Sequence, residues 1–242
     1  MLNPNSHPWL TDPHVSRIVE ALPDGSTRFV GGCVRNALLG AEVEDLDIAT
    51  TLTPEQVMTQ LKAAGIKVIP TGIEHGTITV VAEGTGYEVT TFRADTETDG
   101  RHAVVQFSTD MREDAARRDL TVNALYYDSG KFEVFDHVHG LQDLENRSVC
   151  IIGDPEQRYT EDPVRMLRVV RFAAKLDFNI DPQTAAAIPR CAHLLGEIPA
   201  ARLFDEFLKL FLAGYAAATL EKLLEFELLR YLFPDTSSHI QK

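Results

Sequence analysis

The sequence predicts an α+β protein: a small mixed sheet with helices over residues 26–149, followed by an all-helical part over residues 150–242. Two observations predict this division. Before residue 150, short runs rich in β-branched residues alternate with amphipathic segments, and after it amphipathic segments follow one another with only Pro and Gly between them. With 44% hydrophobic residues, the chain has enough apolar side chains for a sizeable core.

The first part contains five segments with strand character and two with helix character. Residues 1–25, rich in Pro, Asp and Ser, form an N-terminal extension with one short amphipathic helix. The expected strands are 26–32, 44–50, 66–72, 76–83 and 87–93, and the expected helices are 33–40 and 53–65. Thr53 is a helix N-cap with Pro at the next position, and Gly40 and Gly65 end the two helices.

The second part reads as four successive amphipathic helices. They are expected over residues 161–176, 182–196, 199–214 and 216–233. Each shows apolar residues at helical spacing and is bounded by Pro or Gly, so this region is predicted to be an all-α neck and partial body.

Charge and composition limit the function classes. The net charge of −13 excludes a surface that is basic all over, so any nucleic acid would have to be bound by a local basic patch. No apolar run approaches the ~20 residues needed to span a bilayer, and the N-terminus does not resemble a secretory leader. Three widely spaced cysteines fit reduced thiols. We therefore expect a cytoplasmic protein without a membrane partner.

The segment "GGCVRNALLGAEVEDLDIAT" combines a glycine pair with two close carboxylates. Asp45 and Asp47, two apart in an expected strand, would point to one face and could hold Mg²⁺, or they could simply be the polar face of that strand. Gly31 and Gly32 before a helix, with Arg35, could bind phosphate or form a plain turn. Glu88, on another expected strand, could lie near the aspartates.

The segment "RRDLTVNALYY" offers cations and hydrogen-bonding groups. Arg117 and Arg118 suit phosphate, while Asp119 and Asn123, four residues apart, are expected on one helical face where they could contact ribose. The alternative is a helix start with a surface ion pair.

A basic stripe follows in "EDPVRMLRVVRFAAK". Arg165, Arg168 and Arg171 recur every three residues, which is usual for a solvated helix face. However, Glu161, Asp162 and Arg165 would stand one turn apart, and this set of acceptors and a donor could read the edge of a base.

Taken in order, the motifs GG-x-VR, D-x-D, RRD-x-x-x-NA, D…G-x-x-DL and EDPVR-x-LR-x-x-RF resemble one family. This is the bacterial, class II family of CCA-adding tRNA nucleotidyltransferases and poly(A) polymerases, and the likeness runs from about residue 27 to 235. The resemblance implies a nucleotidyltransferase head of the DNA polymerase β type, a helical neck, and RNA 3′ ends with CTP and ATP as partners.

The resemblance also assigns roles to matching residues. Asp45 and Asp47 would be catalytic ligands of two Mg²⁺ ions that promote in-line phosphoryl transfer. The remaining positions would bind the nucleotide: triphosphate at Gly31, Gly32 and Arg35; phosphate and sugar at Arg118, Asp119 and Asn123; the base at Asp162 and Arg165, with Arg168 and Arg171 lining the same pocket.

Three departures from the family pattern stand out. Asn36 replaces the Asp of GG-x-VRD, which keeps hydrogen bonding and removes a charge. His139 replaces a Gly in the D-x-x-G-G turn. The chain ends at Lys242, whereas family members continue into further helical regions that hold RNA.

The segments divide between the two branches of the family. Residues 69–81 and the short segment 96–110 look like CCA-adding enzymes, whereas 197–215 and 223–234 look like poly(A) polymerases. Because the head sets the chemistry, CCA addition to tRNA from CTP and ATP is favoured. The alternatives are poly(A) synthesis and a nucleotide-binding but inactive remnant.

Overall fold

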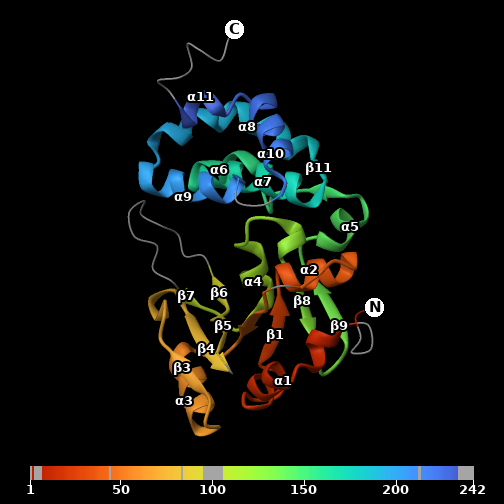
Figure 1. The fold of residues 1–242 in the computed structure, drawn as a ribbon, viewed down its shortest axis with the longest axis vertical. Coiled ribbons are helices and arrows are strands. Elements are labelled where there is room, and N and C mark those ends of the chain that lie inside the picture. The colour runs from red at the N-terminus through yellow and green to blue at the C-terminus, as the bar shows by residue number, and fades with distance from the viewer. Residues whose placement is uncertain are drawn as a thin grey trace. The chain divides into compact units, whose positions relative to one another are not determined.

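The chain folds into two compact units. The computed structural model describes residues 2, 7–43, 45–82, 84–94, 106–211 and 214–233. One unit comprises Met1–Arg118 and Val122–Leu141, and the other Asp119–Thr121 and Gln142–Lys242. Both are drawn in Figure 1. The domain boundaries expected from the sequence, at residues 26 and 150, stay a prediction.

A seven-stranded mixed sheet organises the first unit (Figure 1). Its spatial order is β3-β4-β5-β2-β1-β8-β9, and only β2 and β5 run parallel. The strands are β1 (Thr27–Val30), β2 (Asp47–Thr50), β3 (Lys67–Ile69), β4 (Thr77–Ala82), β5 (Thr85–Thr91), β8 (Leu125–Asp128) and β9 (Glu133–Asp136). A separate pair joins β6 (Arg93–Ala94) and β7 (Gln106–Phe107). Each of the five expected segments contains a strand, but β2 begins only at Asp47 rather than at residue 44, and β3 covers only Lys67–Ile69 of the expected 66–72.

The helices of this unit follow the predicted caps. In α3 (Pro54–Ala63), Thr53 and Gln56 form a reciprocal capping box, and α2 (Gly32–Leu39) ends at Gly40 in the left-handed conformation. The remaining helical elements are η1 (Pro8–Thr11), α1 (Pro13–Glu20), η2 (Ile73–His75), α4 (Met111–Ala116), η3 (Thr121–Asn123) and α5 (Gly140–Glu145). The N-terminal segment packs within this unit, with the Trp9 ring edge-on to Phe29 at 5.0 Å between centroids.

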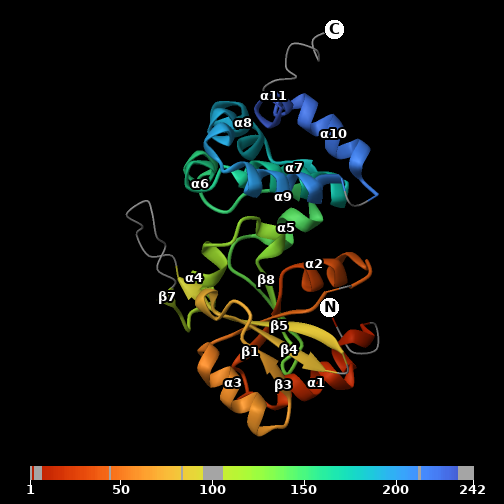
Figure 2. The ribbon, with the colours of Figure 1, turned by 60° about the vertical axis from the view of Figure 1, so that its left-hand side comes forward.

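In the second unit, helices gather around α7 (Val164–Leu176), which contacts α6 (Pro155–Glu161), α9 (Ala200–Phe211) and α10 (Ala216–Glu225) (Figure 2). The others are α8 (Pro182–Cys191), η4 (Ala192–Glu197) and α11 (Leu229–Leu232). The expected helix over 161–176 begins only at Val164, because Asp162 is extended and Pro163 follows it. A short parallel pair, β10 (Ser148–Val149) with β11 (Asn179–Ile180), interrupts the all-helical pattern.

The prediction of a common helical face for Asp119 and Asn123 is wrong. Helix α4 ends at Ala116, Leu120 forms a β-bridge with Ile151, and only the short η3 separates this bridge from β8. The three consecutive residues Leu125, Tyr126 and Tyr127 suit a buried strand, and strand pairing prevails over helical spacing here.

The three cysteines, Cys33, Cys150 and Cys191, are free, as expected. Burial raises the pKa of the Cys33 thiol to about 11 and that of Cys150 to about 12, so both are neutral thiols at pH 7. Within the described residues, no helix has the length and apolar character needed to cross a membrane.

Candidate active site

Gly31 and Gly32 form the turn that leads from β1 into α2. Gly31 is the N-cap of α2 with φ 78° and ψ −127°, a conformation that essentially only glycine adopts without strain. A Cβ at Gly31 would lie 3.8 Å from Asp47 Oδ2 and 4.0 Å from Arg118 Nη1. A carboxylate and a guanidinium from two other segments therefore meet at this turn, beside the first N–H groups of α2.

Asp47 is the first residue of β2, and its register partner on parallel β5 is Glu88. Burial, then the charges of Glu88 and Asp45, raise the pKa of Asp47, while Arg118 opposes this shift. Asp45 is exposed and precedes the strand, contrary to the expected strand over 44–50. The proximity of Glu88 to Asp47 is as the sequence suggested.

These carboxylates fit a divalent cation. Oxygen donors suit Mg²⁺, which is commonly held by one or two carboxylates together with water and substrate phosphates. Among the described residues, no three His, Cys, Asp or Glu side chains gather as a complete metal cage. Asp45 and Asp47, the residues that the family resemblance names, would hold the ion, and its charge would relieve the repulsion between neighbouring carboxylates that helps to raise the pKa of Asp47.

The Arg35 side chain is held by two amide groups. Asn36 Oδ1 accepts hydrogen bonds from Arg35 Nε at 3.1 Å and from Nη2 at 2.8 Å, and Asn123 Oδ1 accepts from Nη1. Asn36 Nδ2 donates to the Glu42 carbonyl at 2.9 Å. Asn36 thus links Arg35, which is buried, to the segment beyond α2, using both ends of its amide.

With Arg35 in the phosphate-binding role that the family resemblance implies, replacing Asn36 with Ala is expected to raise KM for nucleotide about tenfold, because Arg35 loses two hydrogen bonds that fix it. Asn36→Asp is expected to stay within about threefold of the parent KM, since a carboxylate oxygen still accepts both hydrogen bonds from Arg35 and only the donor to the Glu42 carbonyl is lost. Steady-state kinetics with CTP measure both. An Asp variant as impaired as the Ala variant would show that the contact with Glu42, rather than the hold on Arg35, matters.

Arg118 belongs to a buried cluster that the sequence analysis did not identify in full. Its Nη2 forms an ion pair with Asp114 Oδ2 at 2.9 Å, and Arg117 pairs with Oδ1 of the same residue. Burial would raise the pKa of Asp114, but the charges of Arg118 and Arg117 outweigh it and lower that pKa. The i, i+4 spacing of Asp114, in α4, and Arg118, just after its end, is the sequence signal that could have revealed this partner.

In the second unit, Asp119 bridges two of the predicted nucleotide-binding arginines. Its Oδ1 accepts from Arg165 Nε at 2.7 Å, and its Oδ2 accepts from Arg168 Nη1. Burial would raise the pKa of Asp119, but ion pairing with Arg168 and Arg165 lowers it overall. The structure brings these three predicted residues together by their side chains.

Helix α9 adds two residues to this group that the sequence analysis missed. Arg202 Nη2 lies 2.7 Å from Asp162 Oδ2, and Glu206 Oε1 lies 3.7 Å from Arg168 Nη2. These partners are 38–40 residues apart, beyond any local spacing rule, so no sequence signal indicated them. The Glu161–Arg165 pair, at 3.0 Å, follows the expected i, i+4 spacing. The third arginine of the predicted basic stripe, Arg171, has its guanidinium carbon 4.9 Å from the Phe172 ring centroid.

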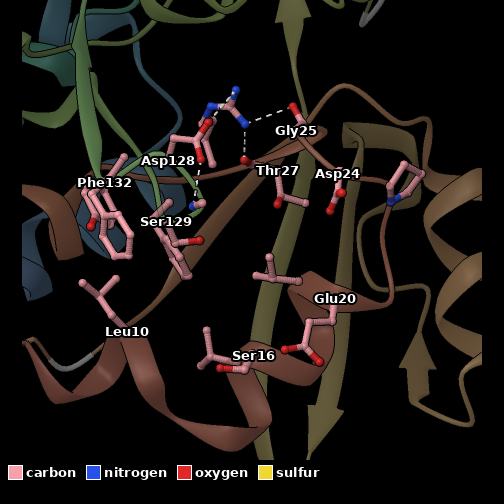
Figure 3. Close-up of a pocket in the computed structure, with 16 residues that line it drawn as sticks. Leu10, Ser16, Glu20, Asp24, Gly25, Thr27, Asp128, Ser129 and Phe132 are labelled. Atoms are coloured by element: carbon pink, nitrogen blue, oxygen red, sulfur yellow. Dashed lines mark hydrogen bonds and ion pairs between the residues drawn. The ribbon is translucent and has the colours of Figure 1, made fainter. Parts of the chain in front are cut away.

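A cavity of about 300 Å³ in the first unit is separate from these residues (Figure 3). Helix α1, the start of β1 and the turn after β8 line it, and it includes none of the predicted site residues. Arg28 lines the cavity. Its guanidinium forms an ion pair with Asp128 at 3.1 Å and donates hydrogen bonds to the carbonyl oxygens of Gly25 and Thr27. This cation is thus engaged by the protein itself.

Known proteins resemble the chain over most of its length. Residues 27–150 match the family model described as Poly A polymerase head domain, and residues 177–240 match one described as the probable RNA and SrmB-binding site of polymerase A. The chain is 42% identical over 217 residues to the CCA-adding enzyme of Ligilactobacillus salivarius, covering 88% of this chain and 52% of the relative. It is 44% identical over 219 residues to poly(A) polymerase I of Escherichia coli O157:H7, covering 85% and 46%.

A solved structure shows the same fold. The Bacillus stearothermophilus CCA-adding enzyme in complex with CTP superposes with a TM-score of 0.81 at 38% identity, over 91% of this chain and 53% of that one. The head, with its glycine turn and carboxylates, is thus of the nucleotidyltransferase class. The chain belongs to the poly(A) polymerase head domain family. It spans about half the length of the relatives described above.

Proposed function

We propose that this chain transfers nucleotides to RNA 3′ ends without a nucleic-acid template, adding C, C and A to tRNA from CTP and ATP. The observation that carries the proposal is that Asp47, a carboxylate for a cation, and Arg118, a guanidinium for phosphate, both reach the Gly31 turn, within 4.0 Å of the position that a Cβ of Gly31 would take. Relatives named as CCA-adding enzymes and a similar fold solved with CTP support it.

In this proposal each group of the first unit acts on the triphosphate. Asp45 and Asp47 would hold Mg²⁺, which when bound neutralises phosphate charge and activates the attacking hydroxyl. Arg35, Arg118 and the N–H groups at the start of α2 bind the phosphate oxygens. The RNA 3′-oxygen forms a bond to the α-phosphorus, the bond to pyrophosphate breaks, and the hydroxyl proton is released.

We assign nucleotide selection to the second unit. Asp162 and Arg165 offer an acceptor and donors that match the hydrogen-bonding edge of C or A, and Arg168 and Arg171 support them. Asp119 orients Arg165 and Arg168 through its ion pairs with them. On this assignment the domain boundaries near residues 26 and 150 separate a catalytic head from a selecting neck, with the N-terminal extension preceding both.

Poly(A) synthesis is the second candidate, because poly(A) polymerase I is as similar to this chain as the CCA-adding enzymes are. Residues 95–105, part of the short segment that favoured CCA addition, lie outside the described residues. CCA addition is favoured by the sequence of this segment and by that of residues 69–81, which include the end of β3, η2 and most of β4.

Incubation with tRNA lacking its 3′ end, and with CTP, ATP or both, tests the proposal. We expect two C residues from CTP alone and a terminal A when both nucleotides are present, read as product length and base composition. Long tails from ATP alone would establish poly(A) synthesis instead. Nucleotide binding without any transfer would identify a nucleotide-binding remnant.

A further inference from the structure

Asp114 is a carboxylate beside Arg118 whose two oxygens are both fully hydrogen-bonded. Its side chain is 1% exposed, and each oxygen accepts three hydrogen bonds. Oδ1 accepts from the Arg93 backbone N–H at 3.1 Å and from Nε and Nη2 of Arg117. Oδ2 accepts from Nε and Nη2 of Arg118 and, at 2.7 Å, from the Tyr126 hydroxyl. One carboxylate therefore joins α4, β6 and β8.

This arrangement fixes the direction of the Arg118 guanidinium. The edge made by Nε and Nη2 faces Asp114, at 3.1 and 2.9 Å, so the remaining nitrogen, Nη1, is turned toward the Gly31 turn. Such two-point pairing constrains the plane of the group as well as its position.

Tyr126 adds a second constraint on the same guanidinium. Its hydroxyl accepts from Arg118 Nε at 3.0 Å while donating to Asp114 Oδ2, and its ring centroid lies 5.3 Å from the Arg118 guanidinium carbon. The Tyr126 side chain is fully buried in β8. A bidentate pair with Arg117 would already compensate the charge of Asp114. The additional hydrogen bonds of Asp114 with Arg118 and Tyr126 therefore serve to orient the Arg118 guanidinium.

We propose that Asp114 and Tyr126 are positioning residues for Arg118, holding Nη1 toward the triphosphate of the nucleotide. This inference rests on the proposed function, and it assigns a task to two residues that do not themselves touch substrate. Two guanidinium groups share the single carboxylate, so the three side chains together favour an anion beside Arg118.

The neighbouring tyrosine provides a matched control. Tyr127 is equally buried in β8, and its hydroxyl donates to the Leu2 carbonyl at 3.2 Å. Successive strand residues face opposite sides of the sheet. Each of the two substitutions, Tyr126→Phe and Tyr127→Phe, therefore removes one buried, hydrogen-bonded hydroxyl. Only Tyr126→Phe removes a hydroxyl that contacts Arg118.

The experiment measures binding of CTP and of inorganic tripolyphosphate by calorimetry, with melting temperatures for every variant. We expect Tyr126→Phe to weaken both ligands about fivefold and Tyr127→Phe to leave both unchanged. Asp114→Asn is expected to weaken them by about 10- to 100-fold, because charged hydrogen bonds are lost. In an Arg118→Ala background, Tyr126→Phe should have no further effect.

The outcomes separate this inference from the proposed function. If the parent protein binds neither ligand, the proposed function fails and the inference with it. If the parent protein binds both but Tyr126→Phe matches Tyr127→Phe, only the positioning role is overturned. The same holds if Tyr126→Phe still weakens binding in the Arg118→Ala background. Since Asp114→Asn could prevent folding, the comparison of the two tyrosines decides the matter.

Discussion

Asp47→Asn is expected to lower the rate of nucleotide transfer by at least about 10³-fold without lowering the melting temperature. A metal ion supplies several kcal/mol of transition-state stabilisation, and ~4 kcal/mol corresponds to about 10³ in rate. Asn keeps the shape of Asp47 and removes the charge that would hold the ion. Radiolabelled CTP or ATP incorporation into tRNA measures the loss.

The unchanged or higher melting temperature of Asp47→Asn follows from the direction in which the pKa of Asp47 is shifted. Burial and then the charge of Glu88 raise the pKa of Asp47, so the ionised group costs folded-state stability at neutral pH. Removing the charge should leave the melting temperature in EDTA equal to that of the parent or higher. Added Mg²⁺ should raise the melting temperature of the parent and not of the variant.

Glu133→Gln is the control, because it neutralises an exposed carboxylate at the start of β9 in the same sheet. It should change neither transfer nor the response to Mg²⁺. Transfer by Asp47→Asn within tenfold of the parent would show that this carboxylate does not hold the metal.

Asp119→Ala is expected to destabilise the second unit by about 2–3 kcal/mol and to weaken CTP and ATP binding together. The side chains of Asp119, Arg165 and Arg168 are 23%, 13% and 30% exposed, so breaking these pairs leaves two mostly buried cations without their shared carboxylate. Glu161 still pairs with Arg165, and Glu206 still lies near Arg168, so both cations keep part of their compensating charge. The loss of stability should therefore be smaller than for a fully buried pair. Denaturant unfolding and nucleotide titration measure the two effects.

The pH dependence of this loss has a defined sign. Because the pKa of Asp119 is lowered in the folded protein, its contribution is fully present well above about pH 4, the range of an unfolded Asp. The contribution disappears as the pH falls through the folded pKa. The difference in the free energy of unfolding between parent and variant should therefore be constant from about pH 6 to 8 and should become smaller in acid.

Glu156→Ala provides the matched control for this variant. It breaks the Glu156–Arg190 pair in the same unit, whose side chains are 52% and 57% exposed. An exposed pair contributes about 0–1 kcal/mol, so little change is expected. A loss as large as that of Asp119→Ala would show that the unit is sensitive to any ion pair, not to the Asp119 bridge.

Much of the fold follows from local patterns. The capping box of Thr53 and Gln56, the glycine that ends α2 and the β-branched runs of β3, β4 and β5 are each specified by a few adjacent residues. The prediction of a helical face within residues 117–123 is wrong. Residues four apart share a face only where the backbone is helical, and here pairing with distant segments determines the backbone conformation.

The sequence by itself determined the chemistry that is available: carboxylates at 45 and 47, a glycine turn before a helix, and arginines in fixed order. Only the tertiary structure decided which groups meet. Asp47 faces Glu88 because β2 pairs with β5, and Arg118 reaches the Gly31 turn because Asp114 and Tyr126 direct it. Contacts between residues far apart in the chain depend on strand register and helix packing, which no local spacing encodes.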